Sequence, residues 1–236
     1  MEKTTVYWTD EISNPPTPTI LNPILEQNAI SLMNVSKGSE IVKCPAFRNY
    51  YKNTLVVRSP NEMTISANGN GGWNIEVVAP PHRNVNEFFR VRDDYLISLS
   101  VHHFFWSETP LLIEQLHPIW MDGDVASYTQ SVSGTFDISK WIRPLQPSFK
   151  LPNPSVIKKI KINVGDPLYV VRIASLENIE FRRFSMTQKL EETIIQSMAV
   201  SSAAPTFFRS IQNYYKAFEQ RKLKKIVTEE IKANLY

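Results

Sequence analysis

The sequence predicts an α+β protein, in which a mainly antiparallel, sandwich-like β domain is followed by C-terminal helices. Short runs rich in β-branched and aromatic residues dominate positions 41–183. Near residue 186 the apolar residues change from strand spacing to helix spacing. Sixteen prolines against seven glycines indicate ordered, proline-punctuated connections. Strands first and helices last are typical of the α+β class.

Composition limits the kind of protein. The 236 residues are 42% hydrophobic, which is enough apolar material for a folded core. A formal net charge of +3 is compatible with nucleic acid as a partner but does not require it. The single cysteine, Cys44, excludes an intramolecular disulfide and a thiolate metal cage. We see no signal peptide and no apolar run of about 20 residues, so we expect a soluble chain with no membrane partner.

We divide the chain into three parts. Residues 1–40 are interpreted as an N-terminal arm, because Pro23 prevents "ILNPILEQNAISLM" from forming one helix. Residues 41–184 form the predicted β-rich domain, and residues 185–236 form a C-terminal helical element.

The strand signal falls in eight stretches: 53–60, 61–68, 71–80, 94–106, 110–118, 128–139, 142–151 and 157–174. The tract "ANGNGGW" between the second and third predicts a hairpin turn with positive φ angles. Alternation of Ile160 and Ile162 with lysines predicts a strand with one buried and one solvated face.

Two apolar stripes predict the helices. The first follows a cap at Thr187 and consists of Leu190, Ile194, Ile195 and Met198. The second predicts a helix or helix pair after Pro205 and consists of Phe207, Ile211, Tyr214, Phe218, Ile226 and Ile231.

"GDPLYVVRI" at 165–173 predicts a structural turn before a buried strand. Gly165 can adopt the left-handed conformation, and Asp166 can accept a hydrogen bond from its own turn. Pro167 lacks an amide donor, which suits the first position of a strand.

The order "GTFD" (134–137), "KWIRP" (140–144) and "IKINVGDPLYVVRI" (160–173) resembles the second half of the β-clip barrel of dUTPases and dCTP deaminases. The resemblance implies a β-clip fold, the alternative to a sandwich-like fold for this domain, and places Asp137, Arg143 and Asp166 at a nucleotide pocket. The early acidic motif, the Arg-Ser-Ser turn and the glycine-rich tail of those enzymes have no match here. We therefore expect the fold without the pocket, and we expect no cofactor.

Four further stretches resemble an uncharacterised protein family of large tailed phages that infect marine cyanobacteria. They are "CPAFRNYYKNTLVVRSP" (44–60), "FFWSETPLLIEQLHPIW" (105–120), "KWIRPLQPSF" (140–149) and "GDPLYVVRI". The resemblance implies a viral origin and a β-rich fold, and it implies no particular activity.

Metal and catalytic candidates are weak. His102 and His103 are neighbours on a predicted strand and point to opposite faces, so either would need His117 and a carboxylate, Glu108 or Glu114, to bind a metal. The simpler interpretation makes the histidines ordinary strand residues.

Cysteine and aspartate candidates have equally simple alternatives. Lys43 and Arg48 would favour a Cys44 thiolate, but a lone cysteine is more often a small apolar residue. The carboxylates of Asp93-Asp94 and "MDGDV" (Asp122 and Asp124) lack the spacing of a calcium loop and indicate polar turns.

Basic residues are concentrated in 140–183, which holds nine Lys or Arg against three Asp or Glu. Interleaved aromatic side chains are typical of a single-stranded nucleic-acid groove. The candidate contacts are Trp141, Lys158, Lys159, Lys161, Tyr169, Arg182 and Arg183. A solvated basic face is the alternative.

The sequence thus favours a non-enzymatic viral protein that acts by binding, as a virion or assembly component or as a factor that engages a host protein. We expect it in the virion or the host cytoplasm, with a protein partner or self-association. Aromatic residues in "EQLHPIWMDGD" (114–124) and "PTFFRSIQNYYKAF" (205–218) are its candidate anchors. A divergent nucleotide-processing enzyme and a nucleic-acid-binding module are the alternatives.

Overall fold

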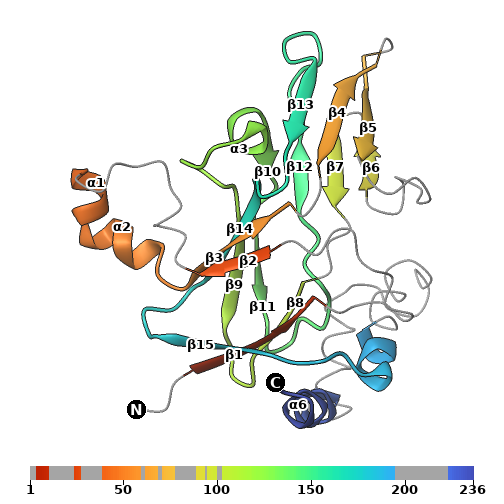
Figure 1. Cartoon of the computed structure of the whole chain (residues 1–236). Coiled ribbons are helices and arrows are strands. Elements are labelled where there is room, and N and C mark those ends of the chain that lie inside the picture. Colours follow the sequence, from red (N-terminus) through yellow and green to blue (C-terminus); the bar gives the residue numbers. More distant parts are fainter. Residues whose placement is uncertain are drawn as a thin grey trace.

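The computed structural model is sandwich-like and mostly antiparallel, with a few helices that include one near the C-terminus (Figure 1). It describes residues 4–10, 24–27, 39–59, 62–68, 71–77, 89–93, 95–99, 103–194 and 223–236. The α+β class predicted from the sequence is confirmed.

A five-stranded antiparallel sheet lies at the centre of the molecule. Its strand order is β11 (Gly134–Asp137), β9 (Leu112–Leu116), β14 (Pro167–Ile173), β3 (Thr54–Arg58) and β2 (Ile24–Gln27). The middle strand, β14, has six of its seven residues buried, which explains its nearly continuous apolar sequence "PLYVVRI".

Two smaller antiparallel sheets adjoin it. One has the order β13 (Lys159–Ile162), β4 (Met63–Ala67) and β5 (Trp73–Val77). The other has the order β10 (Gln130–Ser131), β12 (Ser148–Lys150), β7 (Leu96–Leu99) and β6 (Phe89–Asp93). The predicted alternation in β13 is confirmed, because Ile160 and Ile162 are buried while Lys159 and Lys161 are exposed.

The fourth sheet is mixed. In it β1 (Thr4–Thr9) is parallel to β15 (Ile179–Arg183) and antiparallel to β8 (Phe104–Trp106). The first strand of the predicted N-terminal arm is thus hydrogen-bonded between two strands that come much later in the sequence.

Helices occupy the margins of the sheets. Three short ones are α1 (Glu40–Lys43), α2 (Pro45–Tyr50) and α3 (Asp124–Tyr128). Residues 188–194 form a helix, and Thr187 caps it by accepting a hydrogen bond from the Leu190 amide at 3.2 Å, as predicted. The last helix is α6 (Leu223–Ala233).

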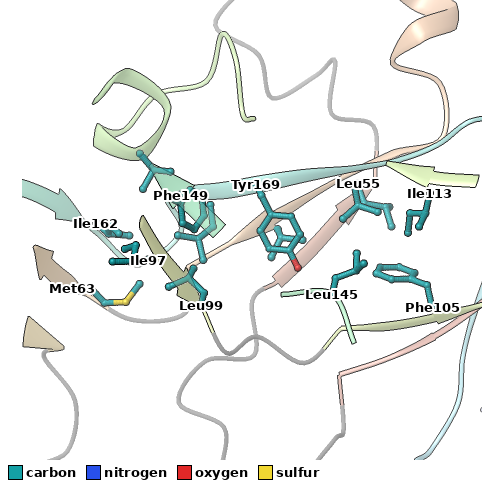
Figure 2. Close-up of a cluster of buried hydrophobic side chains, with 14 of the residues drawn as sticks. Leu55, Met63, Ile97, Leu99, Phe105, Ile113, Leu145, Phe149, Ile162 and Tyr169 are labelled. Atoms are coloured by element: carbon teal, nitrogen blue, oxygen red, sulfur yellow. The ribbon is translucent and has the colours of Figure 1, made fainter. Parts of the chain in front are cut away.

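The main hydrophobic core lies between the sheets. Figure 2 shows Leu55, Ile113 and Tyr169 of the central sheet facing side chains from the other three sheets. Those neighbours include Met63 and Ile162, Ile97 and Phe149, and Phe105. This packing of one sheet on others gives the sandwich-like architecture.

A second core joins the C-terminal helices to the mixed sheet. Its buried residues are Tyr7, Phe104, Trp106, Ile142, Phe184, Leu190, Ile194, Val227 and Ile231. The stripe prediction is confirmed for Leu190, Ile194 and Ile231, which are all buried. Six of the predicted stripe residues lie outside the described residues: Ile195, Met198, Phe207, Ile211, Tyr214 and Phe218.

Ile226 departs from the prediction. Its residue is 39% exposed, because the buried face of α6 is built by Leu223, Val227 and Ile231 at intervals of four residues. Ile226 precedes Val227 by one residue and therefore points about 100° away from that face.

Two predicted strands are shorter than expected. The stretch 94–106 contributes β7 and β8, which belong to different sheets. In 142–151 only Ser148–Lys150 forms a strand, which begins directly after Pro147. Among the described residues, none of the helices has the length and apolar character needed to cross a membrane.

The turn before β14 is structural, as the sequence predicts. Gly165 has a φ of +88°, and the Asp166 carboxylate accepts a hydrogen bond from the Asn163 amide at 2.7 Å. The Gly165 amide donates to the Ser59 carbonyl at 2.7 Å, so the turn is also fixed to the end of β3.

Candidate functional site

A surface aromatic cluster begins on α2. Pro45 occupies the first turn of this helix, where its missing amide donor costs nothing. Phe47, Tyr50 and Tyr51 follow at helical spacing, so their side chains lie on one side of the segment. The ring centroids of Phe47 and Tyr51 are 4.9 Å apart, and those of Tyr50 and Tyr51 are 5.0 Å apart.

Tyr51 anchors this cluster in the protein. It is buried and packs with Val56, Met121 and Val170 in a third, small hydrophobic core. Burial, followed by the nearby Tyr50, raises the pKa of the Tyr51 hydroxyl, which therefore stays protonated and neutral.

Trp120 extends the cluster from a different part of the chain. Its ring centroid lies 5.2 Å from that of Phe47, and the residue is 44% exposed. Its φ is +59°, a left-handed conformation that is rare for a bulky side chain. The preceding residue, Ile119, is 42% exposed. We call Phe47, Tyr50, Ile119 and Trp120 the aromatic surface.

Tyr50 is held by a charged pair on the central sheet. Arg172 of β14 and Glu114 of β9 lie directly opposite each other, and the Arg172 Nε donates to Glu114 Oε2 at 2.8 Å. The Arg172 guanidinium carbon lies 3.9 Å from the centroid of the Tyr50 ring. A cation over the ring face restricts the orientation of this exposed tyrosine.

A groove with a volume of about 660 Å³ adjoins α2 and the ends of β3 and β15. Lys43, Arg48 and Lys52 line it, and none of the described lining residues is acidic. We call it the basic groove. Lys43 pairs with Glu40 at 3.2 Å, and both side chains are largely exposed, so the pair is weak.

Asn53 organises one wall of the basic groove. It has a φ of +56°, which asparagine tolerates well. Its amide nitrogen donates to the carbonyls of Ser175 at 3.0 Å and Glu177 at 2.6 Å, and its amide oxygen accepts from the Ile179 amide at 3.3 Å. The Lys52 amine donates to the Leu176 carbonyl. These bonds fix the segment before β15.

Asp137 and Asp166, the carboxylates implied by the β-clip resemblance, lie at opposite ends of the central sheet. Asp137 pairs with Leu112, whose carbonyl accepts from Ala174 just beyond the end of β14. Asp166 precedes the start of β14, about 25 Å away along the strand.

The two carboxylates have structural partners. Asp137 accepts from the amide and hydroxyl of Ser139 at 3.0 and 2.8 Å, which is a local turn. Arg143 lies in the connection between β11 and β12. The structure therefore does not gather Asp137, Arg143 and Asp166 in one pocket.

The histidines are engaged by the protein itself. His103 is fully buried, with its Nδ1 3.3 Å from the Tyr169 hydroxyl. The Nδ1 of His117 accepts from the Ser131 amide at 3.2 Å, and its Nε2 lies 3.0 Å from the Ala126 carbonyl. Because a carbonyl only accepts, the contact with Ala126 is a hydrogen bond that the His117 Nε2 donates. His102 lies outside the described residues.

The aspartates and Cys44 also form no metal site. Asp124 begins α3 and accepts from the Lys161 amide at 2.7 Å, while Asp93 ends β6. Asp94 lies outside the described residues. Cys44 is exposed at the start of α2. Across the described part of the chain, no three His, Cys, Asp or Glu residues are grouped so as to hold a metal ion.

The candidate nucleic-acid contacts are dispersed. Lys158, Lys159 and Lys161 lie on or beside β13, whereas Arg182 and Arg183 lie on β15 in another sheet at the opposite end of the molecule (Figure 1). They do not form one continuous stripe.

Several of these residues are also engaged or buried. Tyr169 is fully buried and cannot stack on a base, and Trp141 packs on Phe136 with ring centroids 4.6 Å apart. Arg182 pairs with Glu180 at 3.1 Å and Arg183 with Asp10 at 2.5 Å.

One of the two stretches proposed as contact anchors supplies part of the aromatic surface. Residues 114–124 contain Ile119 and Trp120, whereas 205–218 lie outside the described residues. Sequence reasoning considered residues 43–51 for their cysteine and for the resemblance to phage proteins, and it did not identify Phe47 and Tyr50 as binding residues. The signal that could have identified them is the spacing of three and four residues between aromatic side chains after Pro45, which predicts one aromatic face on a short helix.

The chain matches no protein-family model, no curated protein and no solved structure.

Proposed function

We propose that this protein acts by binding another protein through the aromatic surface, as a virion or assembly component or as a factor that engages a host protein. The observation that carries the proposal is the exposed, left-handed Trp120 beside Phe47. Tryptophan and tyrosine are the residue types that most often dominate the free energy of protein association. The resemblance to proteins of tailed cyanobacterial phages supports a viral origin, and with it a place in the virion or the host cytoplasm.

Energetics supports a binding function for Trp120. A left-handed backbone costs a bulky residue about 1–2 kcal/mol, and exposure of the ring forgoes part of its hydrophobic burial. Strain of this kind, where stability does not explain it, is typical of functional positions. A partner that covered the indole ring would recover that lost burial.

Photocrosslinking tests the proposal. Ile119 is replaced by photoreactive benzoylphenylalanine, and the protein is irradiated in a lysate of the infected cyanobacterium that a viral origin implies. We expect one dominant protein adduct, identified by mass spectrometry, which disappears when Trp120→Ser is added. The matched control places the same probe at Val156, which is 75% exposed and lies just before β13. Identical adducts from positions 119 and 156, or an adduct that survives Trp120→Ser, would contradict the proposal.

A further inference from the structure

The basic groove concentrates charge of one sign. Lys43, Arg48 and Lys52 line the same space of about 660 Å³, and no described lining residue is acidic. Within the described residues, the exposed Arg48 guanidinium has no hydrogen-bond or ion-pair partner. A groove lined by cations attracts a negatively charged group and orients its approach.

The basic groove and the aromatic surface lie on neighbouring sides of helix α2. Phe47 and Tyr50 are three residues apart on one side of the segment, and Arg48 and Lys52 are four residues apart on another. Because Phe47 and Arg48 are consecutive, a bound segment that crosses α2 contacts an aromatic ring and a cation within one helical turn.

We propose that the basic groove binds acidic side chains of an extended segment of the partner protein, whose apolar residues pack on the aromatic surface. This inference rests on the proposed function and defines the chemistry of the partner. It predicts aspartate or glutamate close in sequence to a large apolar residue in the bound segment.

The lining favours a peptide over a nucleic acid. Asn49 and Asn178 present side-chain amides, which both donate and accept, and a peptide backbone offers both kinds of group. A phosphate backbone only accepts. A phosphate backbone therefore satisfies fewer of the groove's hydrogen-bonding groups than a peptide does.

Binding of fluorescent poly-L-glutamate to the full chain, followed by anisotropy at fixed salt, tests the inference. The groove variant is Lys43→Glu with Arg48→Glu. The control is Lys158→Glu with Lys159→Glu, which makes the same charge change at exposed positions on and beside β13. We expect the groove variant to lose about tenfold in affinity and the control less than about threefold, since each reversed contact turns attraction into repulsion.

Two results would overturn the inference. Equal losses in both variants would mean that poly-L-glutamate binds through net charge alone. Tighter binding of a single-stranded thymidine oligomer, lost selectively in the groove variant, would assign the groove to nucleic acid. Circular dichroism checks folding, and Lys43→Gln with Arg48→Gln repeats the test without added negative charge.

The two proposals fail separately. Poly-L-glutamate carries no large apolar side chain, so Trp120→Ser leaves its binding unchanged while abolishing the crosslink from position 119. If position 119 gives no adduct that depends on Trp120, while the groove variant still loses more poly-L-glutamate affinity than the control variant, the aromatic surface is rejected as the docking site. The converse result would reject only the acidic character of the partner.

Discussion

At Trp120 two local contributions to stability nearly cancel. Contact with the Phe47 ring, at a centroid distance of 5.2 Å, stabilises by about 0.5–1.5 kcal/mol. The left-handed backbone, with a φ of +59°, costs about 1–2 kcal/mol for a residue with a Cβ atom. Stability therefore does not account for a tryptophan at this position, which is consistent with a role in binding.

Trp120→Gly will be more stable than Trp120→Ala by about 0.5–1 kcal/mol. Glycine avoids the strain of a left-handed backbone, and the greater conformational entropy of glycine in the unfolded chain offsets only part of this gain. Urea denaturation of both variants measures the difference. The control is Lys225, exposed in the right-handed helix α6, where alanine will be more stable than glycine by about 1 kcal/mol. The same order at both positions would contradict a left-handed Trp120.

Gly165→Ala will lower the free energy of unfolding by about 1 kcal/mol. The cause is conformational, since an added Cβ would meet no atom within 4 Å at this φ of +88°. Gly165→Asn will cost less, because asparagine tolerates the left-handed region. Thermal or urea unfolding of the two variants provides the comparison, and equal costs would point to steric crowding instead.

At the scale of elements, a polar contact fastens α6 to the helix at 188–194. Glu230 accepts hydrogen bonds from the Thr187 hydroxyl at 2.9 Å and from the Lys189 amine at 3.1 Å. The hydrogen bond from Thr187, and then that from Lys189, lower the pKa of the Glu230 carboxyl below its ordinary value of 4.5. Below them, Val227 and Ile231 provide the apolar contact.

A lowered pKa fixes the sign of a pH effect. Ionised Glu230 stabilises the fold above its unfolded pKa of about 4.5, and this contribution disappears as the pH falls through the lower folded-state value. Glu230→Gln will therefore unfold more easily than the unmodified chain at neutral pH, and the difference will shrink in acid. Urea midpoints across that pH range measure it, with Glu229→Gln, in a weak exposed pair, as the control. A difference that stays constant with pH would contradict this account.

Local features could be predicted from the sequence. The alternation in β13, the glycine turn at 165 and the cap at Thr187 each depend on neighbouring residues, and the structure confirms all three. The pairing of β1 with β15 could not be predicted, because strands so far apart in sequence leave no local signal of their partner.

The candidate site was predictable only in part, for a related reason. Trp120 was in an aromatic stretch that the sequence singled out, but its contact with Phe47 joins two distant segments. Tyr169 looked like a binding aromatic and is instead fully buried, since β14 is the central strand of its sheet.

At the scale of the whole molecule, strands β1 and β8 of the mixed sheet pack against a core on each face. Side chains alternate along a strand, so Val6 and Phe105 enter the main core, while Tyr7, Phe104 and Trp106 enter the core under α6. The indole nitrogen of Trp106 also donates to the Thr228 hydroxyl of α6 at 3.1 Å. The mixed sheet is therefore the layer that lies between the other sheets and the C-terminal helices, and each side depends on it to bury its apolar residues.

Ile231→Ala will destabilise the whole protein by about 2–4 kcal/mol, because Ile231 is fully buried and the substitution leaves a cavity. Tryptophan fluorescence and far-ultraviolet circular dichroism will shift together, as one cooperative transition requires. Ile226→Ala, at the exposed position one residue before Val227, will change the stability by less than about 0.5 kcal/mol. Separate transitions by the two probes would show that α6 unfolds independently.

The parallel pairing of β1 with β15 also affects how the chain is made. Thr4–Thr9 leaves the ribosome well before its partner Ile179–Arg183 is translated. The second core, which Tyr7, Phe104 and Trp106 enter, waits still longer, because Phe184, Leu190, Ile194, Val227 and Ile231 all follow β15. Nascent chains of this protein therefore cannot complete the mixed sheet until β15 has emerged, and their exposed strands are a natural target for chaperones during that interval.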